Sequence, residues 1–136
     1  MSVGYIVAEH HEQAALFSWA RTPVVLRKYP ELKLLEGSMN GVKLSIGQAG
    51  KAKACGMLKG SPDITLPVAR GGHIGLKIEL KYGRNGATAE QLDILKELGN
   101  AGHKTLVCWG WPAAREEIES YLAMPETDVI FKNDLV

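Results

Sequence analysis

Residues 75–81 alternate between apolar and charged side chains, which is the pattern of a β-strand with one buried face. Its apolar positions are Leu76, Ile78 and Leu80, and its charged positions are Lys77, Glu79 and Lys81. A short strand is also expected over residues 64–68, and residues 70–73 between the two predict a turn. Such a hairpin would bring Glu79 close to Asp63, because both lie at a similar distance from the turn.

Two carboxylates and a lysine at one end of a hairpin suggest a definite chemistry. Asp63 and Glu79 offer the hard oxygen ligands that Mg²⁺ prefers, and Lys81 could help to activate water. These groups are the minimum needed to hydrolyse a phosphodiester. The residues alone leave an alternative open, in which Asp63 is a turn residue and Glu79 and Lys81 form a solvated strand face.

The chain of 136 residues has the length of one domain, so residues 1–136 are expected to form one core without disulfides. Cys55 and Cys108 show no CxxC spacing and are expected to be free thiols. No apolar run approaches the ~20 residues of a membrane span, and no signal peptide pattern is present. We therefore expect a cytoplasmic protein. The net charge of +1 excludes a histone-like basic excess but allows a local basic patch.

The remaining sequence predicts helices between the strands. Helices are expected over residues 9–21, 23–29, 48–55, 88–99 and 112–122. Further strands are expected over residues 32–35 and 105–109, the second as a buried central strand. Thr22 is a typical N-cap, Thr88 and Gln91 form a capping box, and Asn40-Gly41 predicts a turn. This order predicts an α/β fold with a central mixed β-sheet flanked by helices.

Together these motifs resemble the VRR-NUC family, the virus-type replication and repair nucleases of the PD-(D/E)xK superfamily. The resemblance covers roughly residues 9–122, and Pro62-Asp63 and Glu79-Leu80-Lys81 form the two halves of its central motif. Its other landmarks are Glu12-Gln13, Asn40-Gly41, Gly60-Ser61, Gly71-Gly72-His73-Ile74-Gly75-Leu76 and Thr88-Ala89-Glu90-Gln91. The family occurs alone in phages and as the catalytic domain of the Fanconi-associated nuclease. The resemblance implies a restriction-endonuclease-like fold and a stand-alone protein of a bacterium or phage-infected cell.

The resemblance also implies a site for Mg²⁺ or Mn²⁺. Asp63 and Glu79 would bind the cation through carboxylate oxygens, and Leu80 would add its backbone carbonyl. Glu12 would complete the site from the first helix. Glu9, one helical turn earlier, competes with Glu12 for this role.

Two further residues have implied roles in catalysis. Lys81 would lie beside the attacking water and stabilise the negative charge that develops in the transition state. Gln91 resembles the family glutamine near the active site, where it could orient a phosphate or Lys81. Its alternative role is structural, as the capping-box partner of Thr88.

The activity implied by the resemblance is Mg²⁺-dependent, structure-selective cleavage of branched DNA, such as four-way (Holliday) junctions, by a homodimer. The alternatives are a monomeric nuclease for flaps, ends or single strands, and a non-catalytic DNA-binding protein. Trp109 and Trp111 are expected to pack in the core or at its rim, with base stacking as the alternative. The basic residues that could form a DNA-facing patch are Lys51, Lys53, Lys59, Arg70 and Arg84.

Overall fold

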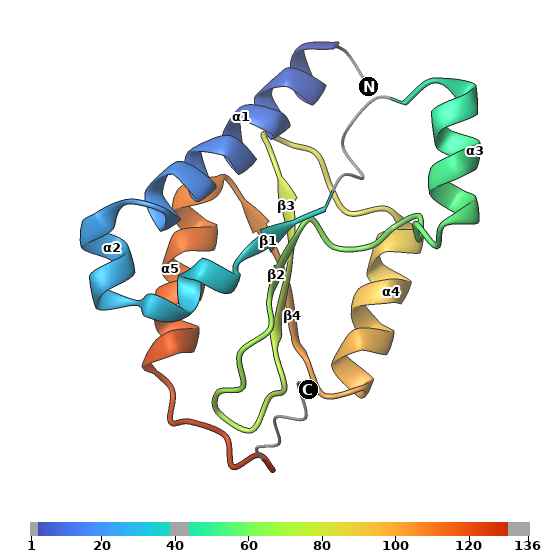
Figure 1. Cartoon of the computed structure of the whole chain (residues 1–136). Coiled ribbons are helices and arrows are strands. Elements are labelled where there is room, and N and C mark those ends of the chain that lie inside the picture. Colours follow the sequence, from blue (N-terminus) through green and yellow to red (C-terminus); the bar gives the residue numbers. More distant parts are fainter. Residues whose placement is uncertain (1–2, 39–43, 131–136) are drawn as a thin grey trace, which may run out of the picture.

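A mixed β-sheet of four strands forms the centre of the computed structural model, which describes residues 3–38 and 44–130 (Figure 1). The strands are β1 (Glu36–Gly37), β2 (Ile64–Leu66), β3 (Leu76–Lys81) and β4 (Lys104–Trp109). Their order in the sheet is β1-β2-β3-β4. β2 pairs antiparallel with both β1 and β3, whereas β4 runs parallel to β3. The predicted α/β fold with a mixed sheet is confirmed.

The helices agree closely with the sequence prediction. They are α1 (Val3–Ala20), α2 (Pro23–Lys28), α3 (Ile46–Ala54), α4 (Ala89–Asn100) and α5 (Trp111–Ala123). Thr22 caps α2 as predicted, because its hydroxyl accepts a hydrogen bond from the backbone N–H of Val25. α1 begins at Val3 rather than at Glu9, and α3 begins at Ile46 because Ser45 is its N-cap.

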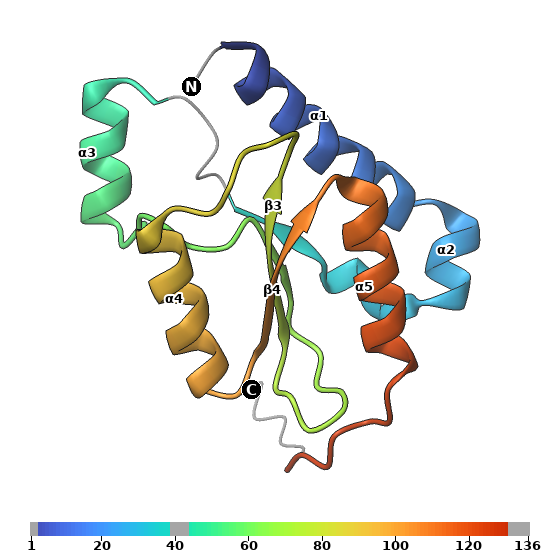
Figure 2. The ribbon, with the colours of Figure 1, turned by 180° about the vertical axis from the view of Figure 1, so that it is seen from behind.

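The helices form a layer on each side of the sheet (Figures 1 and 2). α1, α2 and α5 lie on one side, and α3 and α4 lie on the other. The apolar face of β3 is buried against Leu16 of α1 and Ile118 and Tyr121 of α5, as its alternating pattern predicts. None of the residues of α3 is buried, which is also true of the short helix α2, and Ile46 at the start of α3 is 95% exposed.

Two predicted strands need correction. The strand predicted over residues 32–35 is wrong, because Pro30–Leu34 forms a 3₁₀ helix, labelled η1. Leu32 and Leu35 are buried while the residues between them are exposed, and this spacing of three matches a 3₁₀ turn rather than a strand. The prediction that residues 105–109 form a central strand is also wrong, since β4 lies at the edge of the sheet. Its apolar run is explained by α4 and α5, which contact it.

Three smaller predictions have different outcomes. Cys55 and Cys108 are both free thiols, as expected. The turn predicted at Asn40-Gly41 lies outside the described residues. No helix in the described part of the chain is long and apolar enough to cross a membrane.

Candidate active site

Asp63 and Glu79 meet at the open end of the β2–β3 hairpin, away from its turn. Ile64 lies opposite Ile78 in the antiparallel register, and the next position along places Asp63 opposite Glu79. The carboxylate of Asp63 accepts a hydrogen bond from the backbone N–H of Leu80 at 2.8 Å, so it points towards β3. The predicted proximity of the two carboxylates is confirmed.

Lys81 lies on the same face of β3 as Glu79, as the alternation predicts. Its ammonium nitrogen is 3.5 Å from Oε1 of Glu79. Glu79 is only 2% exposed and Lys81 only 6% exposed. These values are incompatible with the alternative of a solvated strand face. Burial of two charged groups is costly, so their presence here points to a role other than stabilising the fold.

Glu79 also carries an unsatisfied oxygen. Its Oε2 atom is buried and has no hydrogen-bond partner. Burial and, after it, the nearby Asp63 carboxylate raise the pKa of Glu79 from 4.5 to about 8, although Lys81 opposes the shift. A cation between the two carboxylates would satisfy this oxygen and remove the repulsion. The charge of the site therefore fits a divalent cation.

The donor atoms present fit a hard divalent cation. Mg²⁺ is usually bound through one or two carboxylates, together with water and substrate phosphate oxygens. Asp63 and Glu79 provide such a pair, and Leu80 lies beside them on β3. Among the side chains of residues 10–38 and 44–130, no group of three or more His, Cys, Asp or Glu is arranged to hold a metal, and the side chain of Glu9 lies outside these residues. Asp63, Glu79 and the Leu80 carbonyl remain the predicted ligands.

The carboxylate of Glu12 does not form a three-carboxylate cluster with Asp63 and Glu79. Its Oε2 atom accepts a hydrogen bond from the backbone N–H of Trp111 at 2.7 Å, at the start of α5. The first N–H groups of a helix lack partners within the helix, so Glu12 acts as a cap for α5. It still lies at the same end of the sheet, because Gly110 donates its N–H to the carbonyl of Lys81. Its role as a metal ligand stays a prediction.

Gln91 forms the capping box that its spacing predicts. Its side-chain oxygen accepts a hydrogen bond from the N–H of Thr88, and its own N–H donates to the Thr88 hydroxyl. The first turn of α4 lies close to the segment that leads to Asp63. A Cβ added at Gly60, where φ is +87°, would be 3.4 Å from the carbonyl oxygen of Glu90. The structural role is confirmed, and the catalytic role of Gln91 stays a prediction.

The proposed DNA-binding residues lie on exposed segments. Lys51 and Lys53 are exposed on α3, and Arg84 is exposed in the loop between β3 and α4. Lys59 is exposed as well, although it pairs with Glu90 at 3.6 Å. Their exposure allows contact with phosphates, and their function stays a prediction.

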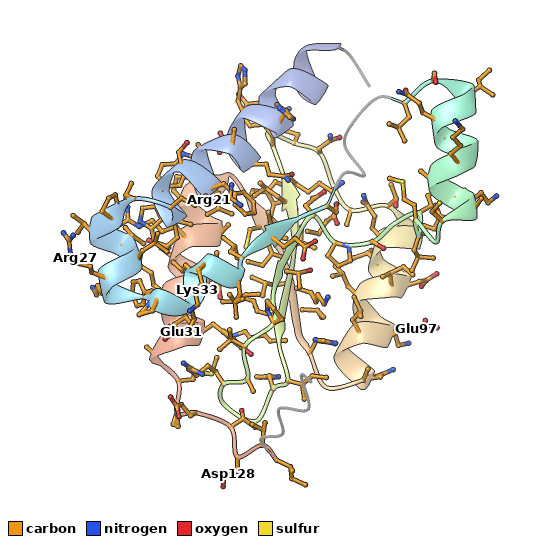
Figure 3. The ribbon with its side chains drawn as sticks, viewed as in Figure 1. Arg21, Arg27, Glu31, Lys33, Glu97 and Asp128 are labelled. Carbon is orange, nitrogen blue, oxygen red and sulfur yellow. The ribbon has the colours of Figure 1, made fainter. Side chains whose placement is uncertain are left out.

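Arg70 differs from these residues because its side chain is only 13% exposed. It lies in the turn of the β2–β3 hairpin, at the opposite end from Asp63, and its guanidinium is near Glu31 and Glu126. Arg70 is therefore part of the folded structure rather than of an open basic patch. Further exposed basic residues lie across the molecule from α4: Arg21 directly after α1, Arg27 on α2 and Lys33 on η1 (Figure 3).

The fold and the site together define a class of protein. A mixed sheet flanked by helices, with paired carboxylates and a lysine at the end of a central hairpin, is a restriction-endonuclease-like domain. A solved structure described as a VRR_NUC domain protein matches this chain with a TM-score of 0.72 and 25% sequence identity. The match covers 92% of this chain and 96% of that one. The resemblance to the VRR-NUC family is thereby confirmed. No family model and no curated protein matches the sequence.

Proposed function

We propose that this protein is a metal-dependent nuclease that hydrolyses phosphodiester bonds in DNA. The observation that carries the proposal is the buried group of Asp63, Glu79 and Lys81, in which an oxygen of Glu79 has no partner. The structural likeness to a VRR_NUC domain protein supports the same reaction class. Charged groups with perturbed pKa values are common at active sites, because catalysis rather than folding explains their placement.

Asp63 and Glu79 would hold Mg²⁺ or Mn²⁺, with the carbonyl of Leu80 as a further ligand. When bound, this cation would polarise a phosphate oxygen and neutralise part of its charge. Asp63 is oriented for its role by the N–H of Leu80, and Glu79 is held rigidly within β3. The protein therefore presents two fixed carboxylates rather than two flexible surface side chains.

Lys81 would act on the water that attacks the phosphate. Oε1 of Glu79 lies 3.5 Å from its ammonium nitrogen, which restricts where the ammonium can lie. A cation at a water-poor site interacts more strongly with developing negative charge than it would in bulk water. We infer that Lys81 stabilises both the nucleophile as it loses its proton and the negative charge on the phosphate oxygens.

Branched DNA, such as a four-way junction, is the proposed substrate. Exposed Lys51, Lys53 and Arg84 would contact phosphates, which position DNA without reading its sequence. A two-fold homodimer would place two active sites to cut opposing strands symmetrically. A monomeric nuclease for flaps or ends is the alternative, and a DNA-binding protein without catalysis is a weaker one.

The test compares labelled four-way junction, flap and linear duplex DNA, each with Mg²⁺, Mn²⁺ or a chelator. We expect Asp63→Asn and Lys81→Ala to lower cleavage by at least about 10²–10³-fold. Lys77→Ala is the matched control, because Lys77 lies on the same face of β3 but donates to the hydroxyl of Thr65 outside the site. Its activity should stay close to that of the wild type.

The results distinguish the nuclease proposal from the narrower proposal that the substrate is a four-way junction. If the wild type cuts none of the substrates with either metal, the nuclease proposal fails. If it cuts flaps or ends but not junctions, the junction proposal fails while the nuclease proposal stands. Light scattering on the purified protein measures whether it is the proposed homodimer.

A further inference from the structure

Trp109 is the last residue of β4 and lies next to Lys81. The parallel register pairs Lys81 with Trp109, and side chains paired across neighbouring strands lie on the same face of a sheet. Cys108, one position earlier, is buried in the core beneath α1 and α5. Trp109 therefore lies on the opposite face, which also carries Glu79 and Lys81.

The Trp109 side chain is exposed but held in place. It is 51% exposed, although Cys108 beside it is 4% exposed. The indole N–H donates a hydrogen bond of 2.7 Å to the backbone carbonyl of Asn85, in the loop between β3 and α4. Since the polar edge of the indole already has a partner, much of the exposed surface is the apolar ring.

The two tryptophans, which were expected to pack in the core or at its rim, differ in burial. Trp111 is partly buried against the core, whereas Trp109 leaves half of its surface in solvent. Single exposed apolar residues are common and need no explanation by themselves. The hydrogen bond to Asn85 and the position beside Lys81 distinguish Trp109, because an anchored ring loses little conformational freedom when a ligand binds.

We propose that Trp109 is a stacking platform for an unpaired nucleobase beside the phosphate that is cleaved. This inference rests on the proposed nuclease function, because it assumes that the phosphate lies at Lys81. A base inside a continuous duplex is already stacked on both faces and offers none to the indole. Stacking is available where a nucleotide has left the helix, at a branch point, a flap or a single strand.

The consequence is a preference for substrate structure over sequence. Every base has an aromatic face, so stacking tolerates all four bases. Lys81 would act on the phosphate while Trp109 selects DNA in which the adjoining base is unstacked. The same chemistry explains how a site built on one rigid hairpin could discriminate against continuous duplex DNA.

The binding experiment uses Asp63→Asn protein, which is expected to bind DNA without cutting it, in Mg²⁺. The DNA is a flap duplex with 2-aminopurine at the first unpaired nucleotide, and a fully paired duplex serves as its control. In this background Trp109→Ala should weaken flap binding about 5- to 150-fold and abolish the quenching of 2-aminopurine. Trp109→Phe loses the bond to Asn85 but keeps an aromatic ring, so it should retain most of the binding. Thermal melting checks that each variant is folded.

The cleavage experiment pairs the protein change with a change in the DNA. An abasic nucleotide at the same position removes the base that would stack. If Trp109 stacks on this base, Trp109→Ala lowers kcat/KM on intact flap DNA. It causes little further loss on the abasic substrate, because the protein change and the DNA change each remove the same stacking interaction. The inference would be overturned if the losses in kcat/KM from Trp109→Ala and from the abasic nucleotide multiply fully. It would also be overturned if 2-aminopurine quenching and flap affinity are equal with Trp109 and with Ala at this position.

These outcomes separate the two proposals. If the wild-type protein cuts DNA and Trp109→Ala cuts all substrates equally well, the stacking inference fails and the nuclease proposal stands. If the wild-type protein cuts nothing but binds flap DNA with quenching that depends on Trp109, the nuclease proposal fails. The placement of the base beside a cleaved phosphate fails with it, while stacking of an unpaired base on Trp109 stands. If it neither cuts nor binds DNA, both fail.

Discussion

The two ends of the β2–β3 hairpin differ in the charged side chains that they bury. At the open end, Glu79 and Lys81 are buried, and one oxygen of Glu79 has no partner. At the turn end, the buried hydroxyl of Tyr121 donates a hydrogen bond of 2.6 Å to the carbonyl of Val68. The open end thus buries charged groups, one of them with an unsatisfied oxygen, whereas the turn end buries the hydrogen-bonded hydroxyl of Tyr121. A neutral ring atom near the turn end, Nδ1 of His103 beside Gly75, is also buried without a partner.

The chain that follows α5 secures the turn end (Figure 1). The N–H of Gly71 donates to the carbonyl of Pro125, and the N–H of Gly72 donates to the hydroxyl of Thr127. The same hydroxyl donates to the carbonyl of His73, which closes the connection. The turn of the hairpin is therefore attached to the segment that follows α5.

This difference separates stability from function. Satisfied buried hydrogen bonds stabilise a fold, whereas an unpaired buried carboxylate destabilises it unless a ligand supplies the missing interaction. Natural proteins break the rules of polar satisfaction mainly at functional sites. Changes at the open end should therefore affect activity and ligand response, and changes at the turn end should affect stability alone.

The largest expected effect is the pH dependence of stability in the metal-free protein. Burial raises the pKa of Glu79 from 4.5, its ordinary value in an unfolded chain, to about 8 in the folded protein. As pH rises, the Glu79 carboxyl therefore loses its proton at a lower pH in the unfolded state than in the folded state. The stability that protonated Glu79 contributes is fully present below pH 4.5 and is lost as pH rises to about 8. The free energy of unfolding should fall by up to about 1.4 kcal/mol per pH unit across this range.

Denaturant unfolding in a chelator at several pH values measures this slope. Glu79→Gln cannot ionise, so it should remove most of the slope and be more stable than the wild type at pH 8. It should also have lost cleavage activity. An unchanged slope in Glu79→Gln would mean that Glu79 does not carry the burial cost inferred for the open end.

The sequence predicts most of the fold because the relevant signals are local. The alternation in residues 75–81 and the capping box of Thr88 and Gln91 depend on neighbours within a few residues, and both are confirmed. The strand predicted over residues 32–35 was wrong because a short, leucine-rich run fits either a strand or a helical turn. Leu32 and Leu35 are three positions apart, which is the spacing of the 3₁₀ helix that forms there. The position of β4 at the sheet edge depends on strand order, which an apolar run does not encode.

The candidate site shows the same division. Asp63 and Glu79 could be paired from the sequence because one hairpin register relates them. The contact between Glu12 and Trp111 joins residues 99 positions apart and depends on how α1 packs beside α5. The exposure of Trp109 depends on the helices leaving the end of β4 uncovered, which no local pattern shows.

The response to a divalent cation is the next effect in size. If a cation binds the folded open end and satisfies Glu79, as proposed, Mg²⁺ at 100 times its dissociation constant should stabilise the protein by about 2.7 kcal/mol. Thermal unfolding with increasing Mg²⁺ or Mn²⁺ measures this shift. Asp63→Asn should reduce it strongly, whereas Lys77→Ala should leave it intact. A shift of equal size in Asp63→Asn would place the cation elsewhere.

The smallest expected effect comes from the turn end, where Tyr121→Phe removes one buried hydroxyl. The change leaves the carbonyl of Val68 without its 2.6 Å hydrogen bond, at a cost of about 1–2 kcal/mol in the free energy of unfolding. Denaturant unfolding measures the cost, and kcat/KM per folded molecule should not change. Tyr29→Phe is the matched control, because its hydroxyl donates to the partly exposed carboxylate of Glu119 and should cost less.

Tyr121→Phe also tests whether the two ends are independent. If the turn end only stabilises the fold, the variant keeps the full Mg²⁺ response and the pH slope assigned to Glu79. If it loses either of them while still folded, the attachment at the turn also sets the geometry of the carboxylates. The distinction matters because β2 and β3 connect Val68 directly to Asp63 and Glu79, so a shift of the turn would move the open end.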